Sequence, residues 1–142
     1  MIVVDANVAA KWYLPELGSE AALELMDGAS PLFAPDLIRL EVLAAITRCV
    51  RTGEAGPEET TARCGDWLRH LRVGAITLVP EGDLLDEALG LSLEIRHNLQ
   101  DCLYLAAARR LDTELITADR TFQERASPLY GRISLLRGCE SN

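Results

Sequence analysis

The chain begins with a short apolar run, Ile2-Val3-Val4, that ends abruptly in the carboxylate of Asp5. An apolar run without polar alternation predicts a strand that is buried on both faces. Such strands are typical of parallel sheets covered by helices. Ligand sites of open α/β sheets lie at the carboxyl ends of the strands, so Asp5 stands where a functional group is expected.

The rest of the chain alternates short apolar strands with helical segments. Apolar periodicity and the positions of Pro and Gly predict helices over residues 6–14, 16–26, 37–52, 57–72, 83–95, 99–111 and 121–125. Further strands are predicted over residues 32–34, 75–79, 114–117 and 132–136. This order indicates an α/β fold with a mainly parallel central sheet and helices on both faces. We expect a single domain over residues 1–137, followed by a C-terminal tail over residues 138–142.

Composition narrows the possible functions of this chain of 142 residues. No apolar run reaches the roughly 18 to 20 residues of a membrane span, and no signal peptide is recognisable, so a cytoplasmic protein without membrane contact is expected. The four cysteines lack a C-x-x-C pair and form no zinc pattern with the two histidines, which favours free thiols. A net charge of −8 argues against binding of nucleic acid that is mainly electrostatic. If the substrate is a phosphate ester, a bound cation must therefore help, and the surplus acid suits a basic protein partner.

Two aspartates, Asp5 and Asp119, each stand where a predicted strand runs into a helix. Each can be explained as a helix N-cap and nothing more. Parallel strands, however, bring their carboxyl ends to the same edge of a sheet, so the pair is stronger evidence for a site than either residue alone.

Two further acids lie in predicted helices. Asp101 has a local explanation, because residues 98–101 resemble a capping box with the acid at the third helical position. Glu41 lies largely on the apolar side of its helix, where a glutamate needs a partner. An ion pair with Arg48 or another arginine is the alternative to a functional role for Glu41.

Four carboxylates that converge on one edge of a sheet repel one another unless a cation neutralises them. Hard oxygen ligands without a Cys/His cluster favour Mg²⁺ or Mn²⁺ over zinc. Such a site activates water and holds the oxygens of a phosphodiester in an in-line displacement. The residues therefore indicate hydrolysis of a phosphate ester.

Four segments, in their order and spacing, resemble the PIN domain family, and more narrowly the VapC-type ribonuclease toxins of bacterial type II toxin–antitoxin pairs. They are Val3-Val4-Asp5-Ala6-Asn7, Arg39-Leu40-Glu41-Val42, Gln100-Asp101-Cys102-Leu103-Tyr104-Leu105-Ala106 and Thr117-Ala118-Asp119-Arg120-Thr121-Phe122. The resemblance covers nearly the whole chain. It implies a PIN-like three-layer α/β/α sandwich in which residues 1–137 form one nuclease domain.

The resemblance also implies an activity, a metal site and partners. The activity is a Mg²⁺- or Mn²⁺-dependent endoribonuclease that hydrolyses RNA with a metal-activated water. The residues that match the catalytic and supporting positions are the acidic quartet Asp5, Glu41, Asp101 and Asp119, with Asn7 and Thr117 in support. Of the quartet, Asp5, Asp101 and Asp119 are expected to hold the metal. Proteins of this type form homodimers and are neutralised by a cognate antitoxin that lies across the active-site groove.

Residues 96–100 depart from the family pattern, because they are bulkier and more polar than the small residues often found before the third acid. Within this stretch, His97 is a candidate proton donor for the leaving oxygen, although a lone loop histidine is more often simply exposed. Arg120 is a candidate contact to RNA phosphate. Lys11, the only lysine of the chain, is expected to be ordinary surface charge.

Three alternatives compete with a nuclease. Receiver domains and haloacid-dehalogenase-type phosphatases also combine a parallel α/β fold with an acidic Mg²⁺ pocket, but both need a lysine late in the chain. The only lysine is Lys11, and Asn7 occupies the place of the phosphatase's second aspartate. The third alternative is a PIN-like module that binds RNA or protein without cleavage.

Overall fold

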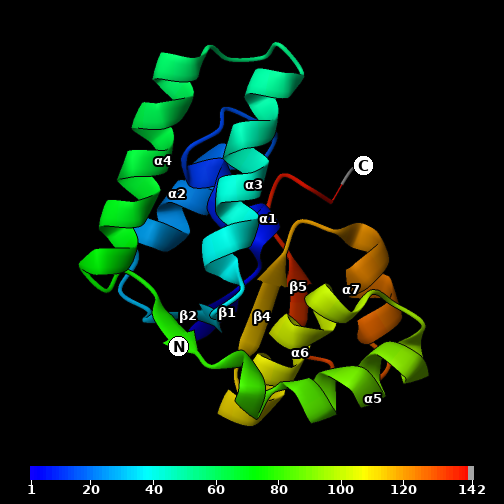
Figure 1. Ribbon diagram of the computed structural model, residues 1–142. Helices are drawn as coiled ribbons and strands as arrows, with labels where there is room; N and C mark the ends of the chain where they lie inside the picture. The colour runs from blue at the N-terminus through cyan, green and yellow to red at the C-terminus, as the bar shows by residue number, and fades with distance from the viewer. Residues whose placement is uncertain (141–142) are drawn as a thin grey trace.

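The central sheet contains five strands in residues 1–140, the part of the chain that the computed structural model describes (Figure 1). The strands are β1 (Ile2–Val4), β2 (Leu32–Pro35), β3 (Thr77–Val79), β4 (Glu114–Thr117) and β5 (Ile133–Leu135). All neighbouring strands are parallel, and their order across the sheet is β3-β2-β1-β4-β5. Neighbouring residues of a strand point to opposite faces, and Val3 and Val4 are both 0% exposed, so both faces of the central strand are covered.

The strand order predicts a ligand-binding crevice beside β1. β1 pairs with β2 through Ile2 and Leu32 and with β4 through Val4 and Ile116. From β1 the chain moves outward to β2 and β3, and it then returns to the other side of β1 for β4 and β5. The order thus reverses between β1 and β4, and ligands of open α/β sheets bind at the carboxyl ends of the strands at such a point.

Seven α-helices and two short 3₁₀ helices surround the sheet in the described residues. They are α1 (Ala6–Ala9), η1 (Ala10–Trp12), α2 (Ser19–Asp27), α3 (Ile38–Arg51), α4 (Pro57–Arg72), η2 (Glu81–Asp83), α5 (Leu85–Ile95), α6 (Leu99–Leu111) and α7 (Arg120–Ala126). Helix α6 packs on β1, β2 and β4, and α5 packs on α6. Helix α7 contacts β4 and β5, while α3 and α4 stand side by side as a hairpin (Figure 1). This arrangement confirms the predicted α/β/α sandwich.

Helix α6 is the most buried helix that faces the sheet. Every residue from Cys102 to Ala108 is buried, because strands cover one side of the helix and α5 covers another. The helix begins at Asn98, whose side-chain oxygen accepts a hydrogen bond from the Asp101 N–H at 2.8 Å. This confirms the predicted cap and fixes Asp101 in the first turn of α6.

The structure differs from the prediction around the first two helices. The predicted helix over residues 6–14 is wrong, because α1 ends at Ala9 and continues as the tighter η1. The Trp12 indole donates to the Ala22 carbonyl at 2.7 Å and so fixes η1 against α2. Helix α2 begins at Ser19 rather than at residue 16, because Gly18 before it has a φ of +85° that other residues rarely adopt.

The described end of the chain packs onto the domain. Cys139 is buried, and a Cβ added at Gly18 would lie 2.9 Å from its Sγ atom. The remaining residues of the predicted tail, 141–142, lie outside the described residues. All four cysteines are free thiols, as expected from their spacing. None of the helices in residues 1–140 combines the length and the apolar character that a membrane crossing requires.

Candidate active site

Thr117 joins the ends of the two central strands. Its hydroxyl donates to Asp5 Oδ2 at 2.8 Å and accepts hydrogen bonds from the Asp119 N–H at 3.1 Å and from Asn7 Nδ2 at 3.3 Å. The Asn7 side-chain oxygen in turn accepts from the Ala118 N–H at 3.0 Å. Three of these four bonds join residues more than 100 positions apart in sequence, so the two predicted supporting residues fix the end of β1 to the end of β4.

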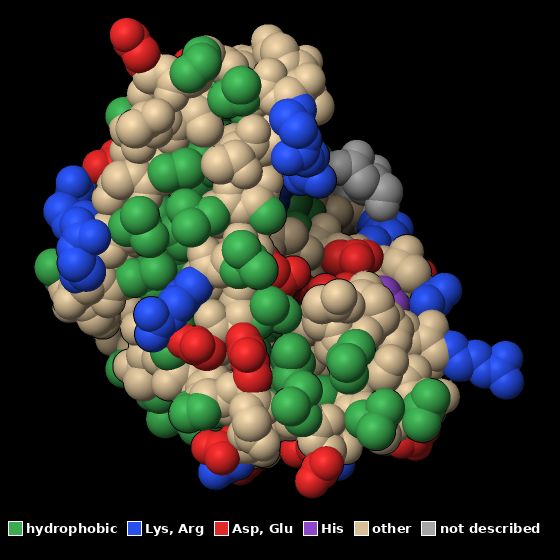
Figure 2. All heavy atoms as spheres, in the orientation of Figure 1, with side chains coloured by type: hydrophobic (Ala, Val, Ile, Leu, Met, Phe, Trp, Pro, Cys, Tyr) green, Lys and Arg blue, Asp and Glu red, His purple; other side chains and the backbone are tan. Residues whose placement is uncertain are grey.

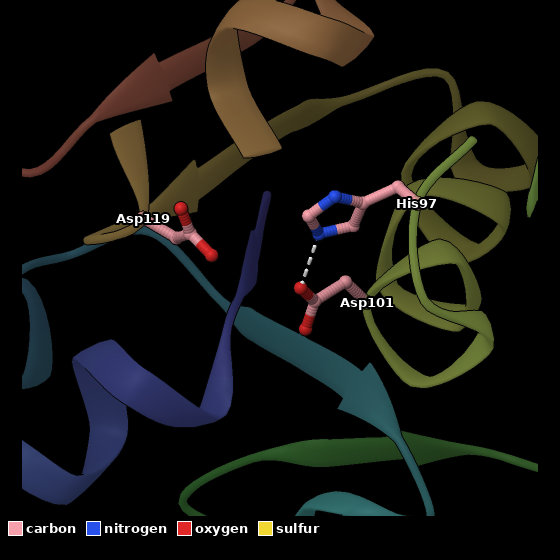
Figure 3. A group of neighbouring side chains, drawn as sticks. All are labelled: His97, Asp101 and Asp119. Atoms are coloured by element: carbon pink, nitrogen blue, oxygen red, sulfur yellow. Dashed lines mark hydrogen bonds and ion pairs between the residues drawn. The ribbon is translucent and has the colours of Figure 1, made fainter. Parts of the chain in front are cut away.

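Asp101 and Asp119 approach each other across the carboxyl edge of the sheet, and His97 lies beside them (Figure 3). One ligand atom from each of these three residues lies within 4.8 Å of the other two. His97 Nε2 is 2.6 Å from Asp101 Oδ2, and Asn98 Nδ2 donates to the same oxygen at 2.9 Å. Asp119 reaches the group from the N-cap position of α7, where its Oδ1 accepts from the Phe122 N–H at 3.1 Å.

Glu41 enters the site from the first turn of α3 and is held there by a buried tyrosine. Tyr104, which is 0% exposed, donates its hydroxyl to Glu41 Oε1 at 2.9 Å. Burial and the charges of Asp5 and Glu41 raise the pKa of Tyr104 far above its usual value. Tyr104 therefore remains a protonated hydroxyl that can only donate to the Glu41 carboxylate.

The acids of the site act on one another electrostatically. Burial, together with the charges of Asp101 and Glu41, raises the pKa of Asp5 to about 8, although the Thr117 hydrogen bond partly opposes this shift. Burial and the charge of Asp101 also raise the pKa of Glu41, against the effect of Tyr104. Asp5, Glu41 and Asp101 therefore lie close enough to destabilise one another as carboxylates.

The donor set fits a divalent cation. No Lys or Arg nitrogen among residues 1–140 lies within 4.0 Å of a carboxylate oxygen of any of the four acids. The raised pKa of the buried Asp5 is the expected property of a carboxylate that needs a positive partner. Carboxylate oxygens with at most one imidazole suit Mg²⁺ or Mn²⁺ better than a soft metal.

The predicted site residues meet at one edge of the sheet, with one difference in detail. Asp101 and Asp119, two of the three predicted metal ligands, belong to the compact group of three residues, and His97 is its third member. Asp5 is connected to this group through Thr117 and through the charge of Asp101.

The helix-cap explanations for the two strand-end aspartates have opposite outcomes. Asp119 caps α7, as its position predicts. The cap prediction for Asp5 is wrong, because no side-chain hydrogen bond caps α1 and Asp5 binds Thr117 on the neighbouring strand instead. Local helix chemistry therefore does not explain why a carboxylate is buried at position 5.

The ion-pair explanation for Glu41 is also wrong. Within the described chain no arginine lies within ion-pair distance of its carboxylate, and the hydrogen-bond partner is Tyr104. Arg48 shares a groove with Glu41 but is two turns further along α3.

A groove of about 560 Å³ opens beside the acids. Its polar lining includes Asn7, Glu41 and Asp119 and also the basic residues Lys11, Arg48 and Arg51. Figure 2 shows acidic side chains within this hollow and basic side chains at its rim. The expectation that Lys11 is ordinary surface charge is wrong, because the residue is 9% exposed, with Nζ 3.7 Å from a carboxylate oxygen of Glu16.

Arg120 lies at the same end of the molecule. It begins α7 directly after Asp119, is exposed, and lines a second hollow together with Lys11 and Asp119. The structure therefore places this predicted phosphate contact next to the acids.

Two residues of the site were missed or misjudged from the sequence. Tyr104 carried a signal, since it lies three residues after Asp101 and therefore on the same side of α6. His97 was expected to be exposed, but its side chain is only 7% exposed. The sequence signal for His97 was its position four residues before Asp101. This spacing is informative only once α6 is known to begin between the two residues.

Comparison with known proteins agrees with this architecture. Ribonuclease VapC3 of Pyrobaculum aerophilum is 27% identical to the chain over 124 residues, which make up 87% of this chain and 93% of that protein. A chain of a toxin–antitoxin complex from Klebsiella pneumoniae has the same fold, with a TM-score of 0.63 at 15% identity. That alignment covers 94% of this chain and 96% of the other. The PIN domain family matches residues 2–128, nearly the whole length, and the protein therefore belongs to the PIN domain family.

Proposed function

We propose that this protein is a Mg²⁺- or Mn²⁺-dependent endoribonuclease of the VapC type, the toxin of a toxin–antitoxin pair. The observation that carries the proposal is the group of four acids at the carboxyl ends of β1 and β4, none of which has a Lys or Arg partner among residues 1–140. Membership of the PIN family and the similarity to Ribonuclease VapC3 support the same activity.

The metal would be held by Asp101 and Asp119, with Asp5 as the third carboxylate. Bound Mg²⁺ or Mn²⁺ would supply Lewis-acid activation of water and would neutralise charge on the scissile phosphate. Thr117 keeps Asp5 oriented through its hydroxyl, and Asn7 keeps Thr117 in place. The supporting residues thus fix ligand geometry before substrate arrives, which reduces the reorganisation needed for catalysis.

Glu41 would orient the attacking water. Tyr104 occupies Oε1, which leaves Oε2 to accept a hydrogen bond from water. Attack on phosphorus forms one P–O bond and breaks the bond to the 3′ oxygen, which leaves with a proton from solvent. The products are a 5′-phosphate and a 3′-hydroxyl.

The basic part of the groove would hold the RNA backbone on one side of the reacting phosphate. Lys11, Arg48 and Arg51 line the same groove as Glu41 and Asp119, and Arg120 lies beyond Asp119. The chain as a whole has a net charge of −8 and repels RNA. Phosphate binding would therefore occur where these few cations lie, which is at the site.

A cognate antitoxin and a second copy of the chain are the proposed protein partners. The structural similarity to a chain of a toxin–antitoxin complex supports the antitoxin. An exposed apolar stripe on α5, formed by Leu85, Leu89 and Leu93, supports a homodimer.

The nuclease proposal is tested by incubating the purified protein with single-stranded RNA and either Mg²⁺ or Mn²⁺. We expect cleavage that a chelator abolishes and that Asp101→Asn lowers at least a hundredfold. The matched control is Asp86→Asn, which changes an exposed aspartate in the first turn of α5 and should leave cleavage unchanged. RNA binding without cleavage in either metal would instead support a non-catalytic module.

A further inference from the structure

His97 makes a short, directed contact with Asp101. It lies between α5 and α6, its side chain is only 7% exposed, and its Nε2 is 2.6 Å from Asp101 Oδ2 (Figure 3). The contact therefore reaches a proposed metal ligand directly.

The imidazole ring of His97 is held by stacking on its face and by hydrogen bonds to the main chain of residues 96 and 97. It stacks on Phe122 of α7, with ring centroids 4.8 Å apart and an interplanar angle of 9°. Ser92 donates its hydroxyl to the His97 carbonyl at 2.5 Å, and Arg125 donates to the Arg96 carbonyl at 2.8 Å. The ring therefore has one orientation, which is set by α5 and α7 together.

The neighbours of the two ring nitrogens indicate which nitrogen carries the proton. The guanidinium nitrogen of Arg125 is 3.4 Å from His97 Nδ1. A guanidinium has donors only, so it favours Nδ1 as an acceptor. Nε2 faces Asp101 Oδ2, which accepts only, at 2.6 Å, while the longer contact of Asn98 Nδ2 to Nε2 at 3.3 Å acts in the opposite sense. The short contact with the carboxylate therefore places the proton of the neutral ring on Nε2. Nε2 then donates to Asp101 Oδ2.

The two carboxylate oxygens of Asp101 consequently have different surroundings. Oδ2 receives hydrogen bonds from His97 Nε2 at 2.6 Å and from Asn98 Nδ2 at 2.9 Å. Oδ1 has no hydrogen-bond partner among the described residues. The two donors thus leave Oδ1 as the oxygen available to a cation shared with Asp119.

From this geometry we propose that His97 is a positioning residue of the metal site. Its Nε2–H would hold Oδ2 of Asp101 and so leave Oδ1 free for a cation. The inference rests on the proposed metal-dependent nuclease and adds a residue to it. Hydrogen bonds to ligating carboxylates commonly change metal affinity by about 10- to 100-fold when they are removed.

Direct ligation by His97 is the competing arrangement, because its ring lies within 4.8 Å of both aspartates. Ligation would require Nε2 to lose its proton and Nδ1 to carry one. The guanidinium of Arg125 beside Nδ1 opposes that tautomer, since it places two donors against each other. The contacts therefore favour a hydrogen bond to the ligand over a bond to the metal.

The test is Mn²⁺ binding to the full chain, measured by calorimetry for two variants of His97. His97→Gln keeps an N–H donor close to the position of Nε2 but loses the stacked ring. His97→Phe keeps a ring that stacks on Phe122 but has no donor. We expect the Kd for Mn²⁺ to rise about 10- to 100-fold in His97→Phe and to stay within about threefold of the parent in His97→Gln.

Two further measurements separate positioning from stability and from ligation. His70→Phe changes the other histidine, which contacts Tyr13 away from the acids, and should leave the Kd unchanged. Thermal unfolding without metal should be similar for the two His97 variants. Spin-echo spectra of the Mn²⁺-loaded protein labelled with ¹⁵N-histidine should show no directly bonded nitrogen.

Several results would overturn the inference. Parent-like affinity in His97→Phe, or an equal loss in both variants, would show that the donor does not matter. A directly bonded histidine nitrogen would make His97 a ligand. If the parent cleaves RNA and binds Mn²⁺ while His97→Phe does so equally well, only the role of His97 fails. If the parent binds no Mn²⁺, the proposed function and this inference fail together.

Discussion

The buried carboxylate of Asp5 is where the electrostatic cost of the site is concentrated. The residue is 2% exposed and close to the charges of Asp101 and Glu41, and its only side-chain donor among the described residues is Thr117. Without a cation, the folded protein can relieve this repulsion only by taking up a proton. Site chemistry and pH-dependent stability are therefore coupled at this one residue.

This coupling predicts how the metal-free protein responds to pH. The pKa of Asp5 is about 8 in the folded protein against 3.8 ordinarily, so between these values the folded state holds a proton that the unfolded chain has released. The free energy of unfolding should therefore fall as pH rises through this window. The raised pKa of Glu41 acts in the same direction.

Urea titrations at several pH values with a chelator present measure this slope. Asp5→Asn should flatten it, and Mn²⁺ should restore stability at the alkaline end in the parent protein. The control Glu58→Gln changes an exposed acid at the start of α4 and should keep the parent slope. An equally steep slope in Asp5→Asn would assign the effect to other groups.

Tyr104 orients Glu41 and favours its charged form against the effect of burial. Tyr104→Phe removes the hydrogen bond that the Glu41 carboxylate accepts. Hydrogen bonds to a charged group are worth roughly 1.5–3 kcal/mol. We expect kcat for RNA cleavage to fall about tenfold or more. The acidic limb of the pH–rate profile should also move to higher pH, because the hydrogen bond lowers the pKa of Glu41.

The matched control is Tyr130→Phe. The Tyr130 hydroxyl donates to the main-chain carbonyls of Ala108 and Thr113 rather than to any acid of the site. Its loss should lower thermal stability while kcat and the pH profile stay as in the parent. A similar kcat loss in both variants would indicate general loosening of the core.

At the scale of elements, α3 carries both kinds of charge that the proposed chemistry requires. Glu41 lies in its first turn and Arg48 in its last, and both line the same groove. The helix therefore spans from the acids to the basic rim, with η1 supplying Lys11 beside it. RNA in this groove would follow the length of α3.

Salt dependence tests this path for RNA. Arg48→Gln should raise the KM for RNA and reduce the slope of log affinity against log salt by about one, as expected for the loss of one phosphate contact. Its kcat should change little, because Arg48 does not contact the acids. Arg72→Gln removes an exposed arginine at the end of α4 and is the control. An unchanged slope in Arg48→Gln would place the RNA elsewhere.

At the scale of the whole molecule, the parallel sheet decides where the site forms, and α5 carries the apolar stripe that is proposed to bind a second copy. Leu85, Leu89 and Leu93 are 47%, 53% and 73% exposed and recur at helical spacing. Exposed apolar residues that adjoin one another mark interaction sites more often than scattered ones do.

Light scattering tests the proposed dimer. The double substitution Leu89→Glu and Leu93→Glu should convert a dimer into a monomer without loss of the folded state, because both side chains are exposed in the single chain. Val73→Glu changes an isolated apolar residue that is 72% exposed and should leave the mass unchanged. A parent protein that is already monomeric, or a dimer that survives the double substitution, would contradict this interface.

The sequence by itself determined the elements whose signals are local. Helix α4 begins at Pro57 and ends at Arg72 as predicted, and the bounds of α6 and β4 also match. Caps, prolines and apolar periodicity act within a few residues, so they can be recognised in one chain. The alternation of these elements was enough to predict the parallel α/β fold, and the family motifs indicated the four acids.

Only the tertiary structure decided which residues act together. It joined Asp5 to Thr117 rather than to α1, Glu41 to Tyr104 rather than to Arg48, and His97 to Phe122. It also buried Lys11, which the sequence left as surface charge. These contacts depend on how helices pack on the sheet, and their partners come from distant parts of the chain. No pattern of neighbouring residues records the burial and charge that such packing creates.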